Sequence, residues 1–152
     1  MEVLRYDLLN YLIDEYNYQD YLEIGVGQGD CLRAVKAKNK DAVENGLEGI
    51  TPPEVTHRMS SDEFFEQNTK KYDLIFIDGG HSYKCCKNDF NNIVRFCNKD
   101  TIIVIDDTCG KKSYSKGPRK VVDELLENNI IKDLKHYENY KKTRHWSEFK
   151  LL

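Results

Sequence analysis

The chain has 152 residues and a formal net charge of −3, with basic and acidic residues mixed along its length. This length suits one domain, predicted to span residues 1–152, and the mixed charge excludes the broad basic surface of a nucleic-acid-binding protein. No apolar run reaches the ~20 residues of a membrane span, and the N-terminus lacks a signal-peptide pattern. Five cysteines without a Cys-x-x-Cys pair are typical of reduced thiols, so we expect a cytoplasmic protein.

The first half of the chain alternates between predicted helices and strands. Apolar residues at helical spacing predict a helix over 3–17, and a short apolar strand follows over 21–25. A second helix is predicted over 29–38. Residues 39–46 are polar and predict a loop or a frayed helix end. A weak strand is expected over 47–50, where two prolines then end it.

The second half contains the clearest strands. Strands are predicted over 72–77, where residues 74–77 form a continuous apolar run, and over 101–105. Such runs are typical of strands buried on both faces of a parallel sheet. Helices are predicted after each of them, over 83–97 and 118–126. Upstream of these runs, either of two adjacent serines, Ser60 and Ser61, is expected to cap a short helix.

Strands that alternate with helices predict an α/β fold with a doubly wound, mostly parallel sheet and helices on both faces. The tail adds apolar segments at 130–137 and 146–151, which predict a C-terminal antiparallel hairpin. Ligands in such folds bind beyond the carboxyl ends of the strands. We therefore expect the functional residues in the loops that follow the strands.

Residues 21–30 form the most informative segment. An apolar strand containing Glu23 runs into Gly25, Gly27 and Gly29. Glycines let a ligand approach the backbone closely, and an acid at this point can receive the ammonium group of an amino-acid moiety. A dinucleotide loop reads Gly-x-Gly-x-x-Gly, but the third glycine position here holds an aspartate. The spacing therefore favours a nucleoside-type cofactor with an amino-acid part, and an ordinary tight turn is the alternative.

Acidic residues follow the two strong strands. Asp78 and His81 come after the first, and Asp106 and Asp107 after the second. If the strands are neighbours, about 5 Å apart, the three carboxylates converge and repel one another unless a cation intervenes. Oxygen ligands favour Mg²⁺ or a similar divalent cation, so Asp78, Asp106 and Asp107 are predicted metal ligands. His81 is the candidate catalytic base. Helix capping and loop hydrogen bonds are the alternatives.

Four segments, in the order YLEIGVGQGDCLRAVKA, GITPPEVTHRMSSDEFF, YDLIFIDGGHSY and TIIVIDDT, resemble the small class I S-adenosylmethionine-dependent methyltransferases. Within that family the chain is most similar to a bacterial and viral branch associated with sugar and natural-product O-methylation. The resemblance covers about residues 20–110. It implies a seven-stranded sheet with a terminal antiparallel hairpin, and methyl transfer from S-adenosylmethionine to a hydroxyl of a small molecule or sugar.

The resemblance also implies roles for individual residues. Glu23 and the three glycines of the loop would hold the methionine part of the cofactor, and Asp78 would lie beside it. Ser61 and Asp62 would lie near the adenine, with a plain helix cap as the alternative for both. Metal-dependent members of the family carry one acid after the fourth strand and an acidic pair after the fifth, which matches the acids named above.

One position departs from the family pattern. Thr51 stands where the family places the acid that binds both ribose hydroxyls, and a hydroxyl cannot replace that charged pair of hydrogen bonds. The departure predicts a loss of roughly 1–3 kcal/mol in cofactor binding. It keeps open a second interpretation, a non-catalytic binding module of the same fold. The sequence has no recognisable substrate domain, so we expect specificity for the methyl acceptor to come from loops, a partner subunit or a second copy of the chain.

Overall fold

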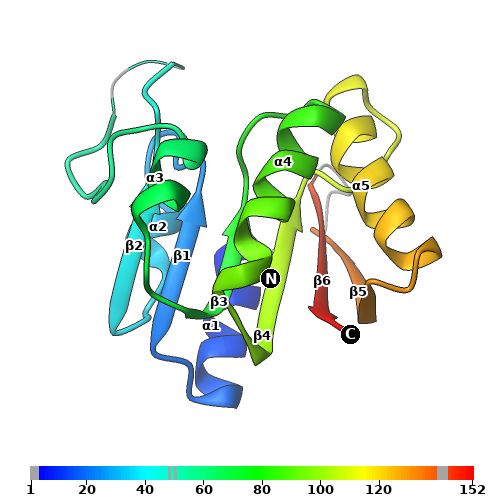
Figure 1. Cartoon of the computed structure of the whole chain (residues 1–152), viewed down its shortest axis with the longest axis horizontal. Coiled ribbons are helices and arrows are strands. Elements are labelled where there is room, and N and C mark those ends of the chain that lie inside the picture. The colour runs from blue at the N-terminus through cyan, green and yellow to red at the C-terminus, as the bar shows by residue number, and fades with distance from the viewer. Residues whose placement is uncertain (1–3, 48, 50, 140–143) are drawn as a thin grey trace.

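The computed structural model describes residues 4–47, 49, 51–139 and 144–152. Six strands within these residues form one sheet in the order β2-β1-β3-β4-β6-β5 (Figure 1). The parallel strands are β1 (Asp20–Ile24), β2 (Asn39–Val43), β3 (Tyr72–Ile77) and β4 (Cys97–Asp106). The antiparallel hairpin is made by β5 (Ile131–Glu138) and β6 (His145–Leu151). The predicted α/β fold is confirmed, but the expected count of seven strands is wrong.

At the edge of the sheet beside β2, the structure has a single β-bridge and no further strand among the described residues. Val43 pairs with His57 in an isolated parallel bridge. The His57 N–H donates to the Ala42 carbonyl at 2.9 Å, and the Glu44 N–H donates to the His57 carbonyl at 3.1 Å. The chain reaches this bridge through Pro52 and Pro53, which have no N–H to donate to a ladder. The edge of the sheet therefore ends in one bridge.

Helices cover both faces of the sheet (Figure 1). One face packs against α1 (Arg5–Tyr16) and α2 (Asp30–Ala34), and the other against α3 (Ser61–Gln67), α4 (Tyr83–Ile93) and α5 (Lys116–Glu127). Two short 3-10 turns, η1 (Val94–Phe96) and η2 (Ser113–Ser115), complete the elements.

The strands bury alternate side chains on the two faces. In β3, Leu74 and Phe76 join the core under α1 and α2, while Ile75 and Ile77 join the core under α3, α4 and α5. This arrangement explains the continuous apolar run. It leaves the loops at the carboxyl ends of the parallel strands to carry polar chemistry. None of the described helices is long and apolar enough to cross a membrane.

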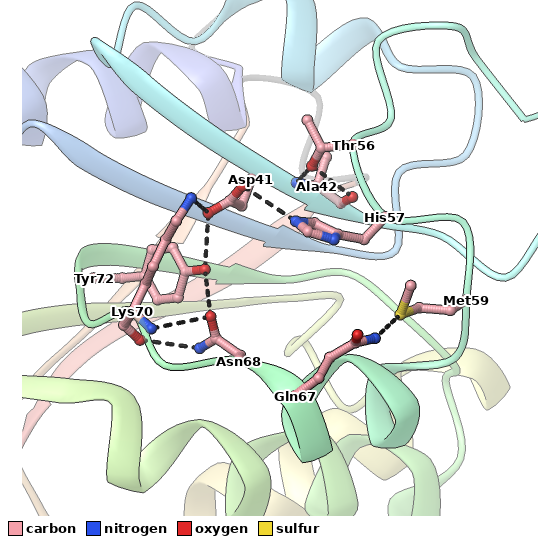
Figure 2. Close-up of polar contacts among 9 residues, drawn as sticks. All are labelled: Asp41, Ala42, Thr56, His57, Met59, Gln67, Asn68, Lys70 and Tyr72. Carbon is pink, nitrogen blue, oxygen red and sulfur yellow. Dashed lines mark hydrogen bonds and ion pairs between the residues drawn. The ribbon is translucent and has the colours of Figure 1, made fainter.

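The polar segment predicted as a loop contains β2. Asp41 of this strand is only 9% exposed, and its carboxylate accepts bonds from Lys70 Nζ and Tyr72 Oη, both at 2.9 Å, and faces His57 Nε2 at 3.2 Å (Figure 2). Burial alone would raise the pKa of Asp41, but these donors outweigh it and hold the pKa below its usual value. The charged strand is therefore stable inside the fold.

The strand predicted over 47–50 is wrong. Leu47 lies in a turn and Gly49 in a bend, while residues 48 and 50 lie outside the described residues. The second strand ends instead at Val43, eight positions before Thr51. Because β2 ends at Val43, the residue that follows it is Glu44 and not Thr51.

Candidate active site

The loops after β1, β2 and β3 enclose a cavity of about 950 Å³. Most of the predicted site residues line it, namely Gly25, Gly27, Ser61, Asp62, Asp78, His81 and Asp107. The other predicted residues do not: Glu23, Gly29, Thr51 and Asp106. The structure therefore places the glycine loop and the acids after β3 and β4 at one site, as expected from the sequence, and moves several residues out of it.

The glycine loop presents open backbone to this cavity. Gly27 has a φ of +53°, and a Cβ added there would meet no atom within 4 Å. Gly29, with a φ of +83°, is the N-cap of α2 and turns the chain into that helix. Space beside Gly27 is what a bound ligand close to the backbone requires.

Glu44, rather than Thr51, follows β2. Its Oε2 accepts bonds from the N–H groups of Val26 at 2.9 Å and Gly27 at 3.1 Å, and its Oε1 from that of Gly46 at 3.0 Å. Burial alone would raise the pKa of Glu44, but the backbone donors hold it below its usual value. The placement of Thr51 at this position is wrong because it followed from a misplaced strand. An ionised acid therefore stands where the sequence indicated none.

Glu23 is turned away from the cavity. It shares a strand face with Tyr21, which packs in the core under α1 and α2, because alternate residues of a strand point the same way. Glu23 is 1% exposed, and its Oε2 accepts a bond from the Tyr21 hydroxyl at 2.7 Å. Burial raises the pKa of this carboxyl to about 7. The expected contact between Glu23 and the cofactor is not supported by this geometry.

Glu23→Gln should make the protein more stable than wild type above neutral pH. The unfolded state loses the Glu23 proton near pH 4.5 and the folded state only near pH 7, so wild-type stability falls as pH rises through this interval. The loss amounts to about 3 kcal/mol, and the glutamine variant avoids it. Urea unfolding at pH 5 and pH 8 measures the difference. An identical pH dependence in both proteins would contradict the prediction.

The start of α3 lines the far end of the cavity. Ser60 makes the helix cap in a capping box with Glu63, so Ser61 and Asp62 are not needed for that role. The Ser61 hydroxyl donates to Asp89 Oδ1 at 2.5 Å. Asp62 Oδ1 accepts bonds from two asparagine amides of α4, at 2.6 and 2.7 Å. Both predicted residues therefore lie fixed at the cavity wall.

The carboxylates after β3 and β4 come together, as the sequence predicts, but they meet a cation from α1. Arg5 Nη1 lies 2.8 Å from Asp78 Oδ2 and also donates to Asp106 Oδ2. The Asp106 side chain is 1% exposed, and its other oxygen accepts the Asp107 N–H at 2.8 Å. Arg5 was not among the predicted site residues, because nothing in the helix pattern indicates its partners.

His81 pairs with Asp107, the residue that directly follows β4. Its Nε2 lies 2.9 Å from Asp107 Oδ2, and Arg144 Nη1 lies 3.6 Å from the other oxygen of the same carboxylate. Burial and the neighbouring Asp106 raise the pKa of Asp107, while His81 and Arg144 oppose the rise. Asp107 also has a φ of 55°, a left-handed conformation that aspartate tolerates better than most residues.

The predicted metal ligands are only partly suited to a shared ion. Ligating atoms of Asp78, His81 and Asp107 lie within 4.8 Å of one another, so these residues could hold a cation. Asp106 instead bonds Arg5, and His81 Nε2 already lies 2.9 Å from a carboxylate oxygen of Asp107. The expected divalent ion stays a prediction, with His81 in place of Asp106 in the set.

A second cavity of about 650 Å³ adjoins the first. Arg5, Asp30 and Arg144 line both cavities. Tyr6 and Trp146 contribute aromatic surface to the second. The buried indole N–H of Trp146 has no hydrogen-bond partner in the part of the chain that the structure describes. This space could take a partly apolar molecule beside Arg5 and Arg144, the two arginines that pair with the acids at the ends of β3 and β4.

Known structures share this architecture. The chain superposes on an O-methyltransferase from Bacillus cereus in complex with S-adenosylhomocysteine, with a TM-score of 0.69 and 14% identity, over 97% of this chain and 80% of the other. It matches TomG from Streptomyces achromogenes, an O-methyltransferase involved in tomaymycin synthesis, solved with S-adenosylmethionine, at 0.70 and 14%, over 97% and 79%. The N-methyltransferase NodS from Bradyrhizobium japonicum matches at 0.65 and 15%, over 97% and 94%. The fold is that of the class I methyltransferases.

A family model described as "Methyltransferase domain" matches residues 33–108, which is half of the chain. The chain belongs to this methyltransferase family, and the resemblance seen in the sequence is confirmed. It is also 27% identical, over 167 aligned residues, to the uncharacterized protein R132 of Acanthamoeba polyphaga mimivirus. That alignment covers 91% of this chain and 72% of the viral protein.

Proposed function

We propose that the protein transfers a methyl group from S-adenosylmethionine to a hydroxyl of a small molecule or sugar. The observation that carries the proposal is the Glu44 carboxylate, which lies at the end of β2 on the cavity wall, beside the glycine loop. The two hydroxyls of a ribose can both donate to one ionised carboxylate. The bound S-adenosylmethionine and S-adenosylhomocysteine in the two O-methyltransferases support the choice of cofactor.

The rest of the cavity matches the other parts of this cofactor. The methionine part would lie against Gly27 and Asp78, because the backbone is open there and a carboxylate is present. The adenine would lie between the glycine loop and the start of α3, beside Ser61 and Asp62. The alternative of a non-catalytic module rested on the acid missing at Thr51, and Glu44 is the acid that we propose for that role.

For methyl transfer, the protein mainly has to position the acceptor and to take its proton. S-adenosylmethionine supplies an activated methyl group on its sulfonium. The acceptor oxygen attacks the methyl carbon, the carbon–sulfur bond breaks toward sulfur, and the hydroxyl proton passes to a base. His81 is the proposed base, since Asp107 holds its Nε2 and leaves Nδ1 for the acceptor. The second cavity, which shares Arg5 and Arg144 with the cavity that His81 lines, offers space for the rest of the acceptor.

Titration calorimetry with S-adenosylhomocysteine tests the proposal. Glu44→Gln should weaken binding by about tenfold to a hundredfold, because bonds to an ionised acceptor contribute about 1.5–3 kcal/mol. Glu54→Gln is the matched control, since Glu54 is half-exposed, bonds Arg33 and does not line the cavity. Absence of wild-type binding at millimolar concentration would contradict the proposal, as would tighter binding of NADH.

A further inference from the structure

Arg5 is fixed by three groups at the carboxyl ends of β3 and β4. Its Nη1 bonds Asp78 Oδ2 and Asp106 Oδ2, and its guanidinium carbon lies 5.8 Å from the centre of the Phe76 ring. Phe76 belongs to the core under α1, the helix that Arg5 begins. Two carboxylates and an aromatic face therefore hold the guanidinium in one place.

The chain itself supplies the positive charge that these acids need. Arg5 faces Asp78 and Asp106, and Arg144 lies near Asp107. Burial alone would lower the pKa of Arg5, but the two carboxylates hold it above its usual value, so its charge is permanent. An ion shared by Asp78 and Asp106 would have to enter the space that this guanidinium fills. Moving Arg5 away without such an ion would leave buried carboxylates uncompensated.

The guanidinium also stands where the two cavities meet. Arg5 lines both of them. Both of its carboxylate bonds use Nη1, and among the described residues Nη2 and Nε have no hydrogen-bond partner. Donors therefore remain for an oxygen of a molecule bound beside Asp78.

We propose that Arg5 is the resident cation of this site. It occupies the position between Asp78 and Asp106 where the sequence predicts a divalent ion, and this pair of carboxylates needs no such ion. Arg5 is a positioning residue, since it fixes both carboxylates and presents its remaining N–H groups to the acceptor. Only the contact with an acceptor rests on the proposed function.

A Mn²⁺ titration of the metal-stripped protein without cofactor, followed by electron paramagnetic resonance, tests this role. Wild type should bind no Mn²⁺ up to about 1 mM. Arg5→Ala should gain affinity by about tenfold or more, because it frees two carboxylates for the ion. Arg5→Lys is the matched control, which keeps a cation and should stay like wild type. A merely structural role for Arg5 would produce no gain in metal affinity.

Two results overturn the proposal. Micromolar Mn²⁺ binding by wild type that is lost in Asp78→Asn would place a metal in the site. A folded Arg5→Ala without gained affinity would show that Arg5 does not exclude an ion. Should that variant fail to fold, Arg5→Gln removes the charge but keeps amide donors, and the same gain is expected.

The two proposals can fail separately. Wild type should bind S-adenosylhomocysteine equally well with EDTA and with Mn²⁺, and binding that requires Mn²⁺ would overturn the role of Arg5. No binding under either condition would reject the proposed function, and the cofactor-free Mn²⁺ titration would still decide the role of Arg5.

Discussion

His81→Ala should lower kcat for methyl transfer by about a hundredfold to ten-thousandfold, the usual contribution of a general base. The side chain lines the cavity of about 950 Å³, and its Nε2 lies 2.9 Å from a buried carboxylate oxygen of Asp107. That pairing orients the ring and stabilises the imidazolium that forms when Nδ1 accepts a proton. Cofactor affinity should change little, because His81 is not among the proposed cofactor contacts, which lie on Glu44, Gly27, Asp78 and α3.

The measurement is formation of S-adenosylhomocysteine with an acceptor found by screening hydroxylated sugars and aromatic compounds. Calorimetry of cofactor binding runs in parallel. His136→Ala is the control, since His136 lies on the C-terminal hairpin and its ring bonds the Ser147 hydroxyl at 2.8 Å. Unchanged turnover in His81→Ala would remove this residue from the mechanism.

The parts of the fold that the sequence predicts best are those buried on two faces. Residues 74–77 of β3 and 102–105 of β4 are continuous apolar runs, and this pattern over so few residues is typical of a strand inside a parallel sheet. Because the ends of these strands are predicted well, the loops that follow them are also placed correctly. Asp78, His81 and Asp107 line the cavity, and the ends of these strands are what placed them together in the sequence.

β2 could not be found by the same rule. Only two of its five residues are apolar, and Asp41 is stabilised by Lys70, Tyr72 and His57, which are distant in sequence (Figure 2). These tertiary partners stabilise a strand that the polar pattern alone does not indicate. Because the second strand was predicted over 47–50 instead, Thr51 was placed at its end. A signal was present nonetheless: Ala42, Val43 and Glu44 repeat the order of apolar residues followed by an acid.

The positions of Glu23 and Arg5 needed other information. The alternation of a strand puts Glu23 on the face of Tyr21, which packs toward α1, so this position could have been inferred from the two-residue period. Arg5 lies 73 residues from Asp78 and 101 from Asp106 in the chain. Only the packing of α1 against the sheet brings them together, and no local pattern records that packing.

Gly25→Ala should cost about 3 kcal/mol of folding stability or more and abolish cofactor binding. A Cβ at this position would lie 2.2 Å from the carbonyl oxygen of Asp78 and 2.6 Å from the Cα of Gly79, both backbone atoms. The φ of +81° adds strain for any residue with a side chain. The backbone has no room to yield, because the Gly25 N–H bonds the Val43 carbonyl at 3.0 Å and the Asp78 N–H bonds the Ile24 carbonyl at 2.8 Å.

Gly27→Ala is the matched variant that separates folding from binding. Gly27 also has a positive φ, but its added Cβ meets no atom within 4 Å, so alanine should cost only about 1 kcal/mol of stability. The new methyl group would stand in the space proposed for the methionine part and should weaken cofactor binding. Urea unfolding and calorimetry measure the two effects for both variants.

A Gly25→Ala protein as stable as wild type would mean that the loops after β1 and β3 do not approach as closely as described. A Gly27→Ala protein with full affinity would mean that the cofactor does not lie against this loop.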